Sequence, residues 1–342
     1  MNRPDLSRRQ WLALSLAAAG GPVLAQPAAP RSARPAASAA ATPSWPSRPV
    51  HLIVGFPAGS SPDLTARTLA EPLSKALGQP VVVENRVGAG GNIAADAVAK
   101  ATDGHTLGLM INGNMTIAKL LNPAVPYDPL KDFAPISLIG TAPLLLTAPA
   151  GAPGASGTEF FLAARNAGNK WSYGSPGVGT VSHIGMELLK SRTGIAPVHV
   201  PYPGNPQVIT AMISGQLQLA LLPPGLALPH IRSGRLRAIG VTSTGRSSLV
   251  PEFPSLDEQG ITRGLQLEVW NGVAAPSSMP RPVIARLSAL ISEITRSADV
   301  RQKLFQQGWQ VAGTSSEGLA NRIKTDTALL GGVIAMRGIK AE

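Results

Sequence analysis

The sequence of 342 residues contains no cysteine. This absence excludes disulfide bonds, thiolate metal sites, a cysteine nucleophile and a lipid-modified cysteine behind an export signal. Charged residues make up only 14% of the chain and aromatic residues 4%. The 44% of hydrophobic residues are nevertheless enough for one or two α/β domains with a large core. Most of the chain is therefore expected to fold.

Several enzyme signatures are also missing. The chain has no G-x-x-x-x-G-K-[ST] phosphate loop, and no G-x-S-x-G elbow, since Tyr173 stands two positions before Ser175. Residues 177–182 come close to G-x-G-x-x-G, but Ser182 replaces the third glycine and no acidic ribose partner follows the next strand. The histidines lack metal-ligand spacing. The sequence therefore predicts a site that holds a ligand without transforming it, with no cofactor and no metal.

The first 25 residues have the pattern of an export signal. Basic residues precede a short apolar stretch at residues 11–19, and small residues precede a cleavage position near Ala25. Arg8-Arg9 fits the twin-arginine pattern, and general secretion is the alternative. The apolar stretch is about half of the ~20 residues that a membrane span needs. We therefore expect cleavage near Ala25 and export to the periplasm.

The region after the signal and the net charge give weaker indications. Residues 26–47 are rich in Ala, Pro and Ser without a periodic apolar face, which predicts a disordered linker. The whole chain has 30 basic and 19 acidic residues, a net charge of +11, which would attract anions. Because the basic residues are scattered, nucleic acid is not an expected partner. A solvated basic surface without a specific partner is the alternative.

Two glycine- and serine-rich segments mark the candidate binding site, residues 56–63 and 172–183. Each lies where a predicted strand gives way to a predicted helix. A helix N-terminus exposes unpaired N–H groups at the positive end of its dipole, so such a loop can cradle a carboxylate or phosphate. In the first segment we expect Ser61 as N-cap, followed by Pro62 and by Asp63 in the first turn. The pair suggests one anion held between two lobes.

Strand, turn and helix units recur along the chain. A first series has strands at residues 49–54, 81–84, 106–111, 134–139 and 144–148. A second has strands at residues 171–174, 196–200, 217–222 and 237–242. Each series predicts a separate sheet with parallel pairing. After Leu265 a further strand should complete the first sheet, and helices at residues 280–297, 300–307 and 316–337 should pack on the first lobe. Thr314 and Glu317 have capping-box spacing for the last helix.

Short motifs follow one another in order from residue 46 to the C-terminus. They are Arg48-Pro-Val-His-Leu-Ile-Val-Gly-Phe-Pro-Ala-Gly59, Gly78-Gln-Pro-Val-Val-Val-Glu-Asn-Arg86, Gly88-Ala-Gly-Gly-Asn92, Asp103-Gly104, Tyr127-Asp-Pro129, Lys131-Asp-Phe-Ala-Pro135, His199-Val-Pro-Tyr202 and Pro229-His-Ile231. Each motif is weak alone, but their ordered series resembles the Bug (TctC-like) substrate-binding proteins of tripartite tricarboxylate transporters. The resemblance covers nearly all of the chain beyond the linker.

The resemblance implies an α/β fold of the two-lobe periplasmic-binding-protein type (type II-like), in which each lobe is a mainly parallel sheet flanked by helices. Lobe 1 would comprise residues 48–145 plus 268–342, and lobe 2 residues 146–267. A hinge would join them near residues 143–147 and 264–269.

The resemblance also implies a periplasmic solute-binding protein, not an enzyme. It would be a monomer that captures a small organic carboxylate and delivers it to a two-component membrane permease. Two alternatives stay open: a ligand sensor that signals to a membrane kinase, and an exported α/β enzyme acting on a carboxylate.

Ligand-binding residues follow from the resemblance by position. The candidates are Phe56, Ala58, Gly59, Ser60, Ser61 and Asp63 in the first loop, and Ser175, Gly177, Gly179, Thr180, Ser182, His183 and Tyr202 around the second. Structural roles remain open for each of them: turn geometry for the glycines, capping for the hydroxyl residues, and a structural hydrogen bond for His183.

The chain departs from the family pattern at three places. Family members commonly have two glycines at Ser60-Ser61, Asp-Asn at Leu222-Pro223, and an aromatic residue at Asn271. If that Asp contacts an amino or hydroxyl group, its loss favours a ligand that is anionic or apolar beyond its carboxylate.

Overall fold

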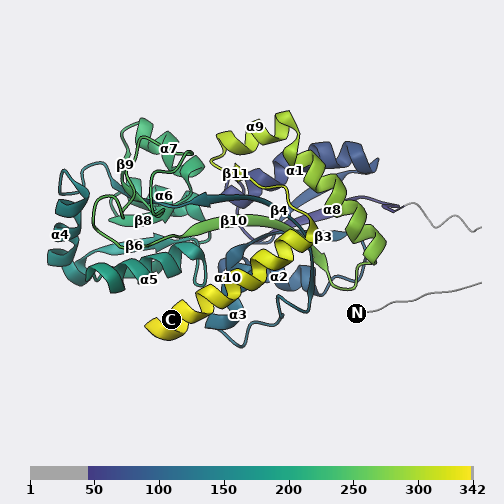
Figure 1. Cartoon of the computed structure of the whole chain (residues 1–342), viewed down its shortest axis with the longest axis horizontal. Helices are drawn as coiled ribbons and strands as arrows, with labels where there is room; N and C mark the ends of the chain where they lie inside the picture. The colour runs from purple at the N-terminus through teal and green to yellow at the C-terminus, as the bar shows by residue number, and fades with distance from the viewer. Residues whose placement is uncertain (1–44, 340–342) are drawn as a thin grey trace, which may run out of the picture. The chain divides into compact units, whose positions relative to one another are not determined.

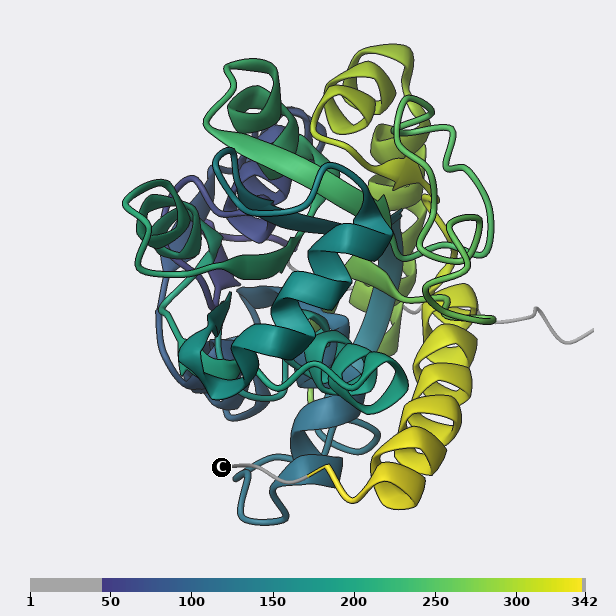
Figure 2. The same ribbon diagram turned by 90° about the vertical axis from the view of Figure 1, so that its left-hand side faces the viewer.

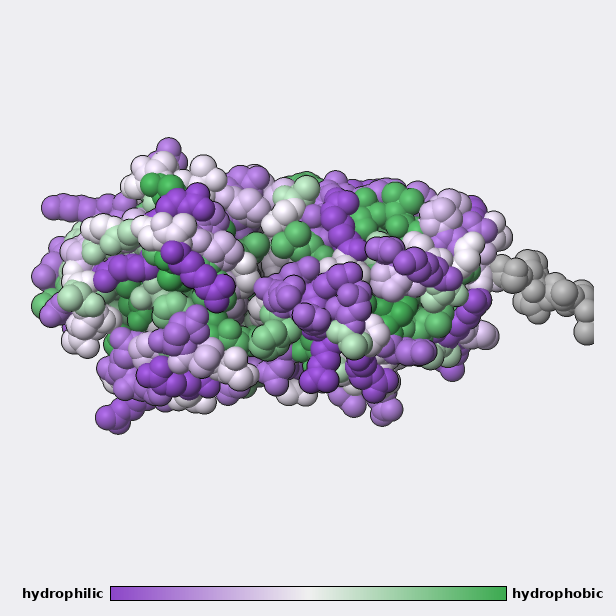
Figure 3. Space-filling model, turned by 90° about the horizontal axis from the view of Figure 1, so that it is seen from above, coloured by the Kyte–Doolittle hydropathy of each residue, from purple (hydrophilic) through white to green (hydrophobic). Residues whose placement is uncertain are grey.

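The computed structural model describes residues 45–339. The predicted export signal, residues 1–25, lies outside the described residues, and so does the predicted linker except for its last three positions. Within residues 45–339, no helix combines the length and apolar character that a membrane crossing requires. Figure 3 shows one face of this folded body, where hydrophilic side chains alternate with apolar patches.

The strands form two sheets, each flanked by helices, as predicted (Figure 1). The strand expected at residues 144–148 was assigned to the first sheet, and this was wrong, because it pairs with strands of the second sheet. The first sheet has the order β11-β4-β10-β3-β1-β2, and the second has the order β7-β6-β8-β5-β9. The strands of the first sheet are β1 (Val50–Val54), β2 (Val81–Asn85), β3 (Thr106–Ile111), β4 (Phe133–Pro143), β10 (Glu268–Pro276) and β11 (Gln310–Val311). Those of the second are β5 (Leu145–Pro149), β6 (Ser172–Ser175), β7 (Val198–Pro201), β8 (Leu219–Leu222) and β9 (Leu236–Val241).

Both sheets are mixed, whereas the prediction was mainly parallel sheets. In the first sheet, β1 pairs in parallel with β2 and β3, but β10 is antiparallel to β3 and β4. In the second, β6 pairs in parallel with β7 and β8, but β5 is antiparallel to β8 and β9. The reason is the path of the chain. β5 and β10 enter their sheets directly from the other half of the molecule, without the helical crossover that makes neighbouring strands parallel.

Helices cover both faces of the first sheet because its strands alternate side chains between the faces. Leu52 of β1 packs in one apolar cluster with α1 (Ser61–Leu77), α8 (Arg281–Arg296) and α9 (Ala298–Gln306). Ile53, the next residue, packs on the opposite face with α2 (Asn92–Ala99) and α10 (Ser316–Arg337). The short helical segments η1 (Ala89–Gly91), η2 (Gly113–Ile117) and α3 (Ala118–Leu121) connect the strands of this half.

The second sheet is covered in the same way. Leu146 of β5 packs with α4 (Gly157–Ala167) and α5 (Val181–Thr193), and its neighbour Leu145 packs with α6 (Asn205–Ile213) and α7 (Pro224–Arg232). The turn η3 (Gly168–Lys170) follows α4. The distribution of strands is compatible with the predicted lobes, whose boundaries stay a prediction.

Two helix starts differ by one residue from their prediction. The N-cap of α1 is Ser60, with Ser61 as the first helical residue. The cap of α10 is Ser315, whose hydroxyl accepts the Gly318 N–H, so the expected box at Thr314 does not form. The Thr314 hydroxyl instead accepts the N–H of Leu138 in β4.

One long helix, α4, has no counterpart in the prediction. Its N-terminus has a complete capping box, in which Ser156 accepts the Glu159 N–H and the Glu159 carboxylate accepts the Ser156 N–H. The S-x-x-E pattern before Phe160 and Phe161 is the signal that could have located it.

The chain passes between the sheets at two adjacent points. Leu144 links β4 to β5, and Leu267 directly precedes β10. Thr242, a fully buried residue after β9, joins both: its hydroxyl accepts the Leu144 N–H and donates to the Leu267 carbonyl, each at 2.9 Å. Backbone hydrogen bonds connect the same three residues. These positions fall in the two segments where we expect a hinge.

The C-terminal helix α10 was expected to pack on the first lobe, and its contacts extend further. It runs along one side of the folded body (Figures 1 and 2). Leu319 and Ile323 pack against the first sheet, whereas Leu330 and Ile334 belong to the cluster that contains residues of β5 and α5. One helix therefore contacts the apolar clusters of both halves.

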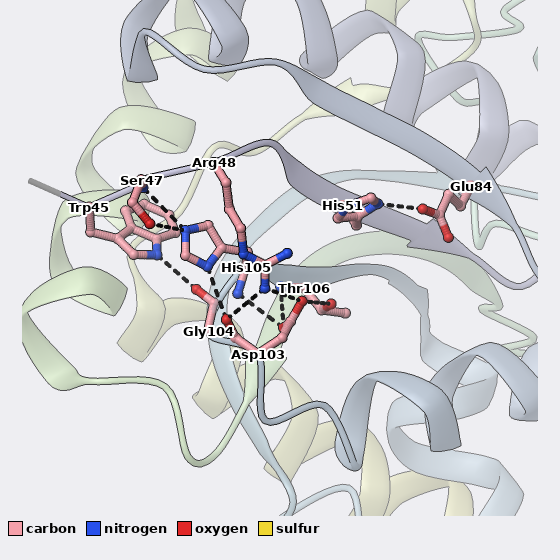
Figure 4. A network of polar contacts seen from close by, with 9 residues as sticks. All are labelled: Trp45, Ser47, Arg48, His51, Glu84, Asp103, Gly104, His105 and Thr106. Carbon is pink, nitrogen blue, oxygen red and sulfur yellow. Dashed lines mark hydrogen bonds and ion pairs between the residues drawn. The ribbon is translucent and has the colours of Figure 1, made fainter.

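The described end of the predicted linker packs against the first sheet (Figure 4). The Trp45 indole donates to the Gly104 carbonyl at 2.7 Å, and the Ser47 N–H donates to the His105 ring. Arg286 of α8 donates to the Trp45 carbonyl. His51 of β1 pairs with the Glu84 carboxylate of β2 (Figure 4). The sequence spacing of the two residues did not predict this pair.

Candidate functional site

A small cavity of about 30 Å³ lies between the two sheets. Both halves of the molecule, which are the parts built on the first and on the second sheet, line this cavity, and Leu144 contributes from the crossover. The lining residues of the first half are Phe56, Ser60, Ser61, Pro62, Ile111, Val269, Asn271 and Trp309. Those of the second half are Pro176, Thr180, Val181, Ser182, Asn205 and Pro223. None of these side chains carries a charge. Any charge on a ligand must therefore be stabilised by hydrogen bonds and dipoles.

The N-termini of two helices meet at this cavity. α1 presents Ser60 and Ser61, and α5 presents Thr180 and Ser182, all of them buried. The first N–H groups of a helix have no partner within the helix, and they carry the positive end of its dipole. The two loops predicted from sequence thus come together, and their geometry suits an anion.

Ser60 differs from an ordinary N-cap residue. Serine at this position usually accepts an N–H of its own helix, but the Ser60 side chain makes no cap hydrogen bond. Its Oγ is buried without a partner in the described structure, on a side chain that is 1% exposed and lines the cavity. Thr180, the N-cap of α5, accepts the His183 N–H instead, and Ser182 Oγ donates to the Leu221 carbonyl.

Asp63 is engaged with its own half of the molecule. Its carboxylate accepts hydrogen bonds from the Gly59 N–H, Arg67 and Asn85. Burial by itself raises the pKa of Asp63, but these hydrogen bonds and the Arg67 charge together hold the pKa below its usual value. Asp63 therefore fixes the first loop, and it does not line the cavity.

Ser175 and His183 lie directly behind the second loop. Ser175 Oγ is 2.7 Å from His199 Nε2 and accepts the Gly177 N–H. The His183 and His199 rings stack with centroids 4.4 Å apart. Burial, followed by the charge of His199, lowers the pKa of His183 to about 4, so its ring is neutral at pH 7. Both Ser175 and His183 are buried and lie outside the cavity lining.

The remaining predicted residues lie nearer the surface. Gly177, Gly179 and Tyr202 line a groove of about 660 Å³ together with residues 87–90, while Ala58 and Gly59 are exposed. None of the unpartnered buried polar atoms of the described residues belongs to this groove. The smaller cavity is therefore the stronger candidate for ligand recognition.

Close backbone contacts between the halves surround the cavity. A Cβ on Gly177 would lie 2.8 Å from Gly90 Cα, and one on Gly204 would lie 2.7 Å from the Pro57 ring. A Cβ on Gly225 would lie only 1.9 Å from the Gln307 carbonyl oxygen. Because real Cβ atoms do not approach this closely, only glycine allows the two halves to meet at these points.

Sequence reasoning missed three polar residues of the cavity as site residues: Asn205, Asn271 and Trp309. The sequence could have pointed to Asn271, because family members commonly have an aromatic residue at this position. Asn205 follows the His199-Val-Pro-Tyr202 motif closely, whereas nothing in the local sequence indicated Trp309. Among residues 45–339, no three His, Asp or Glu side chains gather into a group that could hold a metal ion.

Comparison with known proteins places these features in a family. The family model of the tripartite tricarboxylate transporter family receptor, TctC, matches residues 65–339. BugT of Bordetella pertussis is 34% identical over 267 residues, which cover 78% of this chain and 82% of BugT.

Solved structures agree with this match. MatC from Rhodopseudomonas palustris, solved with bound malate, is 32% identical with a TM-score of 0.81, covering 85% of this chain and all of that one. Rpa4515 of R. palustris, solved with adipate, is 30% identical with a TM-score of 0.83, covering 86% of this chain and 99% of that one. The chain therefore belongs to the TctC family of tripartite tricarboxylate transporter receptors, which are periplasmic solute-binding proteins.

Proposed function

We propose that this protein captures a small organic carboxylate in the cavity between its two halves and delivers it to a two-component membrane permease. Capture is a hinge closure about Leu144 and Leu267, with the carboxylate held by the N-termini of α1 and α5. The protein acts as a monomer in the periplasm after removal of residues 1–25. No covalent step is part of this function.

The observation that carries the proposal is the unused hydroxyl of Ser60. A buried hydroxyl without a partner is costly, and a carboxylate between the two helix N-termini would accept its hydrogen bond. The bound malate of MatC and adipate of Rpa4515 support a carboxylate as the ligand class. A cavity of about 30 Å³ is too small for such a molecule, so the halves must separate to admit it.

The first test is a thermal-shift and calorimetric screen of the purified protein with mono-, di- and tricarboxylates. Binding to the folded state raises the free energy of unfolding by RT ln(1 + [L]/Kd), and the unfolding temperature rises with it. We expect at least one carboxylate to bind and to be recovered unchanged. Absence of binding by every carboxylate, or chemical conversion of the bound acid, would contradict the proposal.

Ser60→Ala tests the site directly. It removes a hydrogen bond to a charged ligand, worth about 1.5–3 kcal/mol, so affinity for the identified carboxylate should fall about tenfold or more. Stability without ligand should not fall and should rise slightly, because Ser60 caps nothing and its buried hydroxyl has no partner.

The matched control is Ser156→Ala at the N-cap of α4, far from the cavity lining. Losing its capping box should lower stability by about 1 kcal/mol and leave affinity unchanged. The opposite pattern, with Ser60→Ala destabilised and binding normally, would place Ser60 in a structural role.

A further inference from the structure

The cavity lining also contains hydrogen-bonding groups that do not belong to the two helix N-termini. Asn271 and Trp309 are each 1% exposed, both line the cavity, and Asn271 Oδ1 and Trp309 Nε1 have no partner in the described structure. Buried polar atoms are normally paired, so two unpaired atoms on residues that line one cavity indicate groups that a ligand completes.

The orientation of the Asn271 amide follows from its neighbours. The Thr65 hydroxyl donates its proton to the Ser61 carbonyl at 3.0 Å, so its oxygen can only accept from Asn271. Asn271 Nδ2 supplies that hydrogen bond at 2.9 Å. The amide oxygen is therefore the atom left for the cavity, and Asn271 acts there as an acceptor. The pairing of β4 with β10 shifts register between Asn271 and Gly272, and such an irregularity changes the local direction of the strand at Asn271.

Trp309 contributes the complementary group. An indole N–H can donate but cannot accept. Two other tryptophans use theirs: the buried Trp270 donates to Asp326, and the half-buried Trp45 donates to the Gly104 carbonyl. Trp309, in the turn between α9 and β11, retains an unused donor beside the cavity.

We propose that Asn271 and Trp309 form a second subsite, which binds a neutral group able both to donate and to accept a hydrogen bond, a hydroxyl or a primary amide. This inference rests on the proposed function, because the ligand carboxylate occupies the helix N-termini. An ionised second carboxylate fits this subsite poorly: it has no proton for Asn271 Oδ1, and no cationic side chain lines the cavity.

The ligand class is thus a small carboxylate with a hydroxyl or amide group at its other end. This differs from the sequence-based expectation of an anionic or apolar remainder, which relied on Leu222-Pro223 alone. Leu222 packs in the core of the second half and only Pro223 reaches the cavity.

Matched ligand pairs test the subsite by calorimetry. We would compare 4-hydroxybutyrate with butyrate, and the monoamide of glutarate with glutarate itself. The member with the neutral donor should bind at least about tenfold more tightly, since the other leaves a buried group unpaired. Equal affinities within both pairs would overturn the subsite while leaving carboxylate capture intact. Failure of every carboxylate to bind would instead reject the proposed function.

Variants assign the preference to its residues. Trp309→Phe should reduce the preference for the hydroxyl or amide ligand, measured as the ratio of affinities within each pair, about tenfold. Thr65→Val leaves Asn271 in place but removes the hydroxyl that orients its amide, so it should weaken the same preference. Trp171→Phe, outside the cavity lining, is the matched control and should preserve the preference.

A general loss of structure is distinguishable from loss of the subsite. Each variant should keep its far-ultraviolet circular dichroism spectrum. If Trp309→Phe and Thr65→Val both retain the wild-type ratio of affinities within each pair, the two residues do not form the subsite.

Discussion

At the scale of single residues, the site depends on polar groups that do not form their usual local hydrogen bonds. Ser60 leaves its own helix uncapped, and Trp309 leaves its indole N–H unpaired, although both are buried. Such conflicts between local preference and global structure concentrate at functional sites. They give no signal in the sequence, because serine before a helix looks like an ordinary cap. Residues of the predicted first loop line the cavity, and the structure shows that Ser60 Oγ is the loop atom without a partner.

His183 gives the molecule a specific pH dependence. Burial, then the nearby His199 charge, lowers its pKa to about 4, while Glu187 acts in the opposite sense and Lys190 in the same sense. The unfolded chain takes up this proton near pH 6.5. Because the unfolded state then binds more protons, stability falls as the pH drops from about 6.5 to about 4, by about 3 kcal/mol in total.

The prediction is checked by urea unfolding of the wild type and of His183→Gln at pH 7.5 and pH 4.5. The wild type should have a lower free energy of unfolding at pH 4.5 than at pH 7.5, and the variant should lose most of this difference. A variant with an undiminished difference would place the pH dependence elsewhere.

At the scale of elements, the contacts between the halves depend on glycine. Gly225 near the start of α7 lies against the Gln307 carbonyl at the end of α9. The two helices pack on different sheets. Gly225→Ala must separate them, because the new Cβ would lie 1.9 Å from that oxygen. We expect weaker carboxylate affinity, about tenfold, with a larger radius of gyration in X-ray scattering at saturating ligand.

The matched control is Gly151→Ala, where a Cβ would meet no atom within 4 Å. It should preserve both affinity and the closed dimensions. If Gly225→Ala also closed normally on its ligand, the contact at Gln307 would not limit closure.

Local patterns predicted the early elements well. β1 and β2 were expected within one residue of their ends and α1 within one residue of its start, because these signals lie within the segments themselves. α4 was missed although its capping box is visible, and β11 is only two residues long. The antiparallel entry of β5 and β10 was not predictable, because strand direction depends on how the whole chain passes between sheets. The cavity wall of Asn271 and Trp309 depends on that same passage.

At the scale of the whole molecule, Thr242 joins the two crossovers. Its hydroxyl bridges the Leu144 N–H and the Leu267 carbonyl, the points where the chain changes sheets. Thr242→Val would leave both groups buried without this partner, which should lower stability by about 2 kcal/mol. Hydrogen exchange should accelerate at the Leu144 amide. The change in radius of gyration on ligand binding, measured by X-ray scattering, should differ from that of the wild type.

Thr242→Ser keeps the hydroxyl and should restore both stability and exchange protection. Should Thr242→Val behave as the wild type does in both measurements, the hydroxyl bridge would have no part in holding the crossovers together.

Trp309 has one more consequence, which concerns how the protein can be observed. It is buried at the cavity, while Trp45, Trp171 and Trp270 lie outside the cavity lining. A ligand that accepts the indole proton changes the polarity around that ring and leaves the surroundings of the others unchanged. The protein thus contains its own optical reporter: the emission of one native fluorophore should follow occupancy directly, without a dye or an attached label.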